Sequence, residues 1–168
     1  MQVRKRLMAA AVAALVVSAL TPTTAGAATN GNRCWEYKSW ERSFATKINR
    51  ARSSRNRTKL RLDPELSKVA RAHTHAMARK QDLFHSSSAN LRNRITNWTM
   101  LGENVGYGGD VQSLHRAFMD SPAHRANVLN GSFVHVGVGV VNKNGVMYVT
   151  MVYEARTDPG TTLSMPRC

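Results

Sequence analysis

Apolar residues recur every three or four positions in the first half of the chain, a spacing typical of amphipathic helices. Trp40, Phe44, Ile48 and Ala51 predict a first helix on this basis. The helix runs into residues 50–61, a stretch rich in basic and polar side chains that holds no acidic residue. We therefore expect an exposed basic loop there. Its basic residues are Arg50, Arg52, Arg55, Arg57, Lys59 and Arg61.

Capping signals mark the starts of later helices. Asp63 is a good N-cap followed by Pro64, and Ser121-Pro122 repeats this pair further along the chain. Asp110 is expected to cap the helix between them. A short turn or helix is expected around residues 91–95. The first half and the middle of the chain are therefore predicted to be mainly helical.

The apolar period changes to two near residue 134, where valines alternate with His135, Gly137 and Gly139. A turn at residues 142–145 and a second strand, Val146–Tyr153, complete an antiparallel hairpin. Glycines on one face of a strand imply close approach by another element. Helices first and a hairpin last predict the α+β class.

The chain begins with a basic segment followed by an apolar one. Basic residues at positions 4–6 precede the uncharged stretch 7–20, and small residues at 25–27 suit a cleavage site. This order is typical of a secretory signal peptide, here residues 1–27. The alternative is an uncleaved membrane anchor, but the apolar stretch is shorter than the roughly 20 residues that a span needs. We expect a secreted, extracellular protein.

Export would place the two cysteines in an oxidising compartment, where disulfides persist. Cys34 follows the expected cleavage site closely and Cys168 is the last residue of the sequence. We expect a structural disulfide between them. A free thiol and an intermolecular link are the alternatives.

Composition and charge limit the class of protein and the kinds of partner that we expect. A length of 168 residues favours one domain, and 42% apolar residues exclude a disordered chain. The formal charge of +14 indicates affinity for anionic polymers. Residues 50–61 lack the interleaved aromatic side chains of a platform for single-stranded nucleic acid. We therefore expect anionic cell-wall polymers or lipid headgroups as partners, and not nucleic acid.

Glu103 lies among apolar and small residues in a predicted loop at 101–105. A carboxylate in such surroundings needs a partner or takes up a proton. Two interpretations stay open: Glu103 caps a turn, or it points into a cleft and pairs with a histidine. The sequence holds no signature of a serine hydrolase, a phosphate-binding loop or a dinucleotide site. A glycosidase pair would need Asp120 as the second acid.

Metal-binding spacings such as HExxH and HxxxH are also missing from the sequence. His85 and His124 lie beside turn signals, where each could bond a carboxylate or bind a divalent cation. We expect the remaining histidines to be structural or leave them unassigned: His73 in the core, His75 and His115 at the surface or in packing contacts, and His135 without a role.

Four motifs occur in a fixed order along the chain. They are Phe84-His85-Ser86, Gly102-Glu103-Asn104-Val105, the run Phe118–Leu129, and Val136-Gly137-Val138-Gly139. Together they resemble the CAP superfamily of cysteine-rich secretory, antigen 5 and pathogenesis-related 1 proteins, in a short bacterial form. The resemblance spans residues 40–155.

This resemblance implies an α-β-α sandwich with a central antiparallel sheet, and a cleft lined by two histidines and acidic residues. His85 and His124 match the histidine positions, and Glu103 matches the first acid. The second acid falls at Asp120 or Ser121. The resemblance therefore gathers residues that spacing alone would not join.

The resulting hypothesis is a secreted CAP-domain protein whose cleft binds Zn²⁺, another divalent cation or a small ligand. A purely structural polar network is the alternative for the same residues. A second hypothesis is a secreted hydrolase of peptides or cell-wall polymers with Glu103 as acid/base. The expected organisation is a signal peptide (1–27), a segment with Cys34 (28–39), the CAP domain (40–155) and a tail with Cys168 (156–168).

Overall fold

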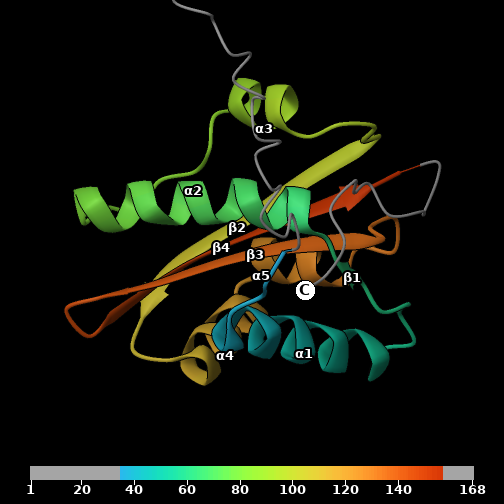
Figure 1. Cartoon of the computed structure of the whole chain (residues 1–168). Coiled ribbons are helices and arrows are strands. Elements are labelled where there is room, and N and C mark those ends of the chain that lie inside the picture. The colour runs from blue at the N-terminus through green and yellow to red at the C-terminus, as the bar shows by residue number, and fades with distance from the viewer. Residues whose placement is uncertain (1–34, 157–168) are drawn as a thin grey trace, which may run out of the picture. The chain divides into compact units, whose positions relative to one another are not determined.

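A computed structural model describes residues 35–156 of the chain, in which helices and strands form layers (Figure 1). The expected signal peptide and both cysteines, Cys34 and Cys168, lie outside these residues. The helices are α1 (Ser39–Ser53), α2 (Pro64–Lys80), α3 (Ser88–Arg94), α4 (Val111–Asp120) and α5 (Pro122–Leu129). The strands are β1 (Arg61–Leu62), β2 (Met100–Gly108), β3 (His135–Lys143) and β4 (Val146–Ala155).

The four strands form one sheet in the order β1-β3-β4-β2. The predicted hairpin is present as β3 and β4, which pair antiparallel with His135 opposite Glu154. β2 pairs antiparallel with β4 along its length and forms one edge. The short β1 forms the other edge and runs parallel to β3. The α+β class with an antiparallel sheet centre is confirmed.

Helices cover both faces of this sheet (Figure 1). α2 lies across β3 and β4 on one face, with α3 nearby. α1, α4 and α5 pack together on the other face. This arrangement is the α-β-α sandwich that the family resemblance implies. Among residues 35–156, no helix has the length and apolar character needed to cross a bilayer.

The two glycines of β3 let α2 approach the sheet closely, as predicted. A Cβ at Gly137 would lie 2.1 Å from the carbonyl carbon of Leu66, and one at Gly139 would lie 2.4 Å from the amide nitrogen of Arg71. Real Cβ atoms do not occur at such distances, so glycine is required at both positions. The valines on the opposite face of β3 are buried in the larger core, against α1, α4 and α5.

The predicted caps Asp63 and Asp110 place the starts of α2 and α4, whereas the side chain of Ser121 makes no capping hydrogen bond at the start of α5. Asp63 Oδ1 accepts a hydrogen bond from the backbone amide of Leu66 at 3.0 Å, one turn into α2. Asp110 Oδ1 accepts from two amides at the start of α4, at 2.7 and 2.9 Å. α2 ends at Lys80, and its C-cap Gln81 adopts a left-handed conformation with φ 54°.

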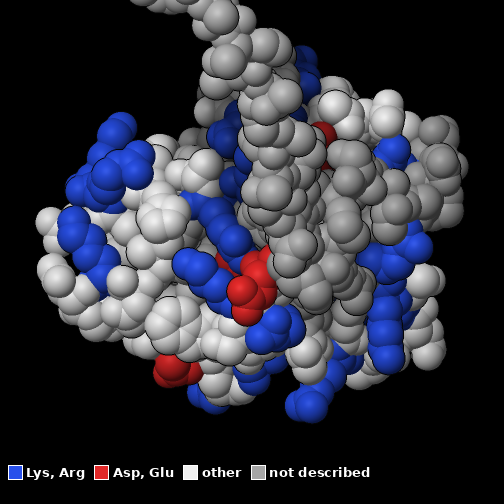
Figure 2. Space-filling view, viewed as in Figure 1, with Lys and Arg blue, Asp and Glu red and all other residues white. Residues whose placement is uncertain are grey.

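The basic run 50–61 departs from the predicted exposed loop. α1 continues to Ser53, and Arg52 is fully buried. The other basic residues of the run are exposed. Arg52 therefore cannot belong to an anion-binding surface, and its inclusion there was wrong. On the face drawn in Figure 2, Lys and Arg side chains are spread widely and surround a small group of acidic ones.

Arg52 is buried because backbone carbonyls surround its guanidinium. Nη1 donates to the carbonyls of Val128 and Asn130 at 2.9 and 2.8 Å, and Nε donates to that of Thr58 at 2.7 Å. Nη2 donates to the carbonyl of Phe133 at 3.4 Å. The side chain thus satisfies carbonyls at the end of α5 and joins them to α1.

The predicted loop around Glu103 is also different in the structure, because residues 100–108 form strand β2. Its glycines obscure the strand pattern. A Cβ at Gly106 would lie 2.7 Å from the ring of Phe118, and one at Gly108 would lie 3.1 Å from Leu114. Small residues are present where α4 packs, and the expected apolar alternation is lost.

Candidate functional site

Glu103 lies on the edge strand β2 and pairs with His85 from the loop between α2 and α3. His85 Nδ1 lies 2.9 Å from Glu103 Oε1, and the backbone amide of Ser86 donates to the same oxygen at 2.9 Å. The Glu103 side chain is 5% exposed, whereas that of His85 is 59% exposed. A buried carboxylate therefore holds a histidine that faces solvent.

His73 fixes the loop that carries His85. It is buried, as expected, and its Nε2 lies 2.7 Å from the backbone carbonyl of Phe84. A carbonyl only accepts, so Nε2 carries the hydrogen. The rings of His73 and Phe84 also meet edge to face, with centroids 5.1 Å apart. His73 thus positions the residue next to His85 without reaching the cleft.

Two asparagines hold α5, and with it His124, against β2. Asn127 Nδ2 donates to the backbone carbonyl of Glu103 at 3.2 Å and to Asn104 Oδ1 at 2.8 Å. Asn104 Nδ2 donates in turn to the backbone carbonyl of His124 at 3.0 Å. Both asparagines belong to the motifs of the sequence, yet nothing in those motifs indicated a role for them. They fix the backbones of the cleft residues.

The environment of His124 favours the neutral form of its imidazole. Burial lowers the pKa of His124, and the charge of nearby His85 lowers it further. Its ring meets Phe118 edge to face at 5.2 Å. The ring also borders a pocket of about 240 Å³ whose other lining residues are mostly apolar or small. A neutral imidazole keeps a lone pair that can bind a cation.

The second oxygen of Glu103 has no such partner. Oε2 is buried, and the structure gives it no hydrogen bond. Asp120, the weaker cleft candidate, is exposed at the end of α4, and no hydrogen bond or ion pair among residues 35–156 links it to the cleft. The geometry therefore brings together His85 and Glu103, places His124 close to His85, and leaves Asp120 apart.

Sequence reasoning missed a second cluster. Asp63, His135 and Glu154 each offer one ligand atom, and these atoms lie within 4.8 Å of one another. All three residues are buried. Counting back along the hairpin from its predicted turn places His135 opposite Glu154, so the sequence did carry a signal for part of this cluster. The position of Asp63 depends on β1 pairing with β3, which no pattern indicated.

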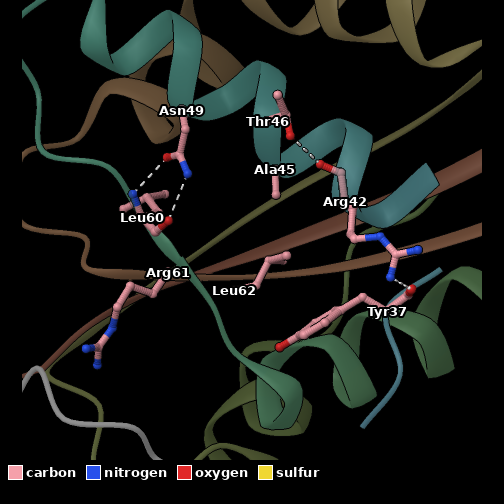
Figure 3. Close-up of a pocket in the computed structure, with 8 residues that line it drawn as sticks. All are labelled: Tyr37, Arg42, Ala45, Thr46, Asn49, Leu60, Arg61 and Leu62. Carbon is pink, nitrogen blue, oxygen red and sulfur yellow. Dashed lines mark hydrogen bonds between the residues drawn. The ribbon is translucent and has the colours of Figure 1, made fainter. Parts of the chain in front are cut away.

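Two other pockets among the described residues hold fewer side chains that could bind a metal ion. The pocket drawn in Figure 3 measures about 440 Å³ and lies between α1 and β1. Asn49 bonds both backbone groups of Leu60 along its wall, at 2.9 and 2.8 Å. Its lining contains no histidine and no carboxylate. His115 lines a separate pocket, and burial lowers its pKa.

A family model covers the part of the chain that holds His85, Glu103 and His124. The model of the cysteine-rich secretory protein family, CAP, matches residues 45–153. This chain belongs to the CAP family. The matched residues include His85, Glu103 and His124, and the match ends one residue before Glu154.

One curated relative and one solved structure each cover about two thirds of this chain. YkwD of Bacillus subtilis is 29% identical over 114 residues, which cover 64% of this chain and 44% of YkwD. The chain thus spans less than half the length of that relative. An extracellular protein of Bacillus anthracis with an SCP domain has a TM-score of 0.62 and 24% identity, covering 69% of this chain and 40% of that one.

Other solved structures share the fold. An outer surface protein of Borrelia burgdorferi has a TM-score of 0.64 at 16% identity, over 69% of this chain and 92% of that one. NaASP2, solved with Zn²⁺, has a TM-score of 0.55 at 17% identity, over 80% of this chain and 87% of that one. At these identities the likeness concerns the fold alone.

Proposed function

We propose that this chain is an extracellular CAP-domain protein whose cleft of His85, Glu103 and His124 binds a divalent cation. One observation carries the proposal. Glu103 Oε1 is fully engaged by His85 and Ser86, while Oε2 is buried without a partner. A buried anionic oxygen without a partner costs free energy, and a bound cation removes that cost.

The histidines suit this role. Nδ1 of His85 faces Glu103, so in the neutral imidazole its Nε2 keeps the lone pair. His124 has a lowered pKa and supplies a second neutral ring. Imidazole nitrogens and a carboxylate oxygen are ligands that Zn²⁺ accepts in proteins. A cation held there would act as a Lewis acid toward a ligand in the adjoining apolar pocket.

Three further residues, His73, Asn104 and Asn127, hold the segments that carry the cleft histidines. They fix the loop and the helix that present the two histidines, but do not themselves reach the cation. Residues that orient metal ligands through hydrogen bonds tune metal affinity. The zinc bound to NaASP2, a protein of the same fold, supports this proposal.

The proposed location outside the cell rests on two further points. The pattern of residues 1–27 predicts a secretory signal peptide. The Bacillus anthracis protein of the same fold is an extracellular one. No observation on residues 35–156 favours the hydrolase alternative.

Zinc titration by calorimetry tests the cleft. We expect the H85A/H124A variant to bind one Zn²⁺ fewer per chain than the wild type, because two ligands are lost. H75A is the matched control, since His75 is an exposed histidine on α2 outside the cleft, and we expect its zinc binding to be unchanged.

A second variant isolates the carboxylate. E103Q keeps the shape of the side chain and removes its charge, and we expect the cleft to bind Zn²⁺ about 10- to 100-fold more weakly. Zinc binding equal to that of the wild type in both E103Q and H85A/H124A would refute the cleft proposal. Circular dichroism confirms that each variant is folded.

A further inference from the structure

Three buried side chains meet where β1, β3 and β4 come together at the start of α2. Asp63 caps α2, His135 begins β3, and Glu154 lies opposite His135 on β4. Their exposed fractions are 2%, 1% and 0%. The cluster shares no residue with the cleft, although Glu154 on β4 lies opposite Leu101 of β2, two residues along that strand from Glu103.

The hydrogen bonds define the protonation state of His135. Arg61 Nη2 lies 3.1 Å from His135 Nε2, and a guanidinium can only donate. Nε2 therefore carries the lone pair, and Nδ1 donates to Glu154 Oε2 at 3.0 Å. His135 is neutral in this arrangement, so it does not balance the negative charge of Glu154.

Glu154 also has an oxygen without a partner. Oε1 is buried, and the structure gives it no hydrogen bond. Such an atom is rare in a folded protein and indicates a missing water, ion or other ligand. An orphaned oxygen within a cluster of ligand-type side chains favours a cation as that missing group.

The surroundings add to the negative charge. Glu65, in the first turn of α2, accepts hydrogen bonds from Thr96. Burial raises the pKa of Glu65, and the charges of Asp63 and Glu154 raise it further against the opposing effect of Thr96. Asp63, Glu65 and Glu154 thus place three carboxylates around the cluster, and a divalent cation is attracted to such surroundings.

We propose that Asp63, His135 and Glu154 form a second, buried site for a divalent transition-metal ion, with one imidazole and two carboxylate ligands. This donor set suits Zn²⁺ and Mn²⁺. The guanidinium of Arg61 contacts His135 from the edge strand and competes with the ion for this negative site. The site is structural in character, because it ties the start of α2 to three strands and is closed to solvent.

The test uses the H85A/H124A background, in which the cleft no longer binds metal. The purified protein is equilibrated with Zn²⁺ or Mn²⁺, dialysed and assayed for metal content by mass spectrometry. We expect one ion per chain. E154Q added to this background should remove it, and so should D63N, in which asparagine still caps α2.

Arg61 provides a variant with the opposite effect. R61Q removes the competing charge without removing a ligand, and we expect several-fold tighter metal binding than in the same background with Arg61. R55Q is the matched control, because Arg55 is an exposed arginine outside the cluster. Metal binding should also raise the melting temperature of R61Q and leave that of E154Q unchanged.

Several results would overturn the proposal. They are the absence of bound metal in the H85A/H124A protein, metal retained by either E154Q or D63N, and weaker metal binding in R61Q. The cleft proposal can fail independently. In that case wild-type protein and the H85A/H124A variant hold the same number of ions, and E154Q lowers both equally.

Discussion

Arg52 shows how one buried side chain can connect segments that are distant in sequence. Its guanidinium donates to carbonyl groups from the loop after α1, from the end of α5 and from the segment before β3. Hydrogen bonds from a charged donor contribute more to stability than neutral ones. The other basic side chains of the run 50–61 are exposed.

Replacing Arg52 should therefore destabilise the fold strongly. We expect R52M to lower the free energy of unfolding by about 3 kcal/mol, because it leaves buried carbonyls without donors. Urea denaturation followed by fluorescence measures the change. R55M is the control, with an expected change within about 0.5 kcal/mol, because Arg55 is exposed. Equal effects of the two substitutions would contradict this account.

At the residue scale, only the family resemblance grouped His85, Glu103 and His124 in one predicted cleft. Spacing alone could not join His85, Glu103 and His124, because they come from a loop, a strand and a helix. The burial of Arg52 could not be predicted either. Its partners are backbone carbonyls, which leave no signature in the identities of the side chains.

At the scale of elements, the contact of α2 with β3 depends on the absence of side chains. Gly137 and Gly139 face α2, and the helix backbone occupies the volume where a Cβ would lie. This contact also helps to position Asp63, since Asp63 caps α2. The packing of one helix thus positions the buried cluster.

Adding a methyl group to this strand should displace the helix. We expect G137A to lower the free energy of unfolding by about 3 kcal/mol or more, because backbone atoms of α2 cannot move aside easily. Thermal and urea denaturation measure the loss. G109A is the matched control, because a Cβ there meets nothing within 4 Å. A stability of G137A equal to that of G109A would show that α2 adapts.

Elements with local signals were predicted well. The caps Asp63 and Asp110 marked helix starts, and the alternating valines marked β3. β2 was missed because its glycines at 102, 106 and 108 make room for side chains of the facing layer. β1 was missed because its two residues pair only through a long-range parallel contact.

At the scale of the whole molecule, basic side chains are a general feature of the surface, and one of them, Arg61, also contacts the buried cluster. Basic side chains are spread over the face drawn in Figure 2. The exposed residues of the run 50–61 are one part of this distribution. Whether they bind an anionic polymer as a patch, or only through net charge, can be separated by experiment.

We expect R55Q/R57Q/K59Q to bind linear polyphosphate more weakly, with a shallower dependence of the binding constant on salt concentration. Fewer phosphate contacts release fewer counterions, which explains the shallower slope. R79Q/R92Q/R94Q is the control, because it removes the same charge from exposed positions elsewhere. Identical binding by the two triple variants would exclude a specific role for this run.

The hairpin register carries a final consequence for sequence variation. His135 and Glu154 face each other at the end of the hairpin that is farthest from its turn. Alternate residues of a strand point to opposite faces, so a one-residue insertion in the turn that shifted the pairing of β4 would turn Glu154 away from α2. The length of a solvent-exposed turn therefore constrains a buried cluster at the far end of two strands, and natural insertions or deletions there are expected to be rare.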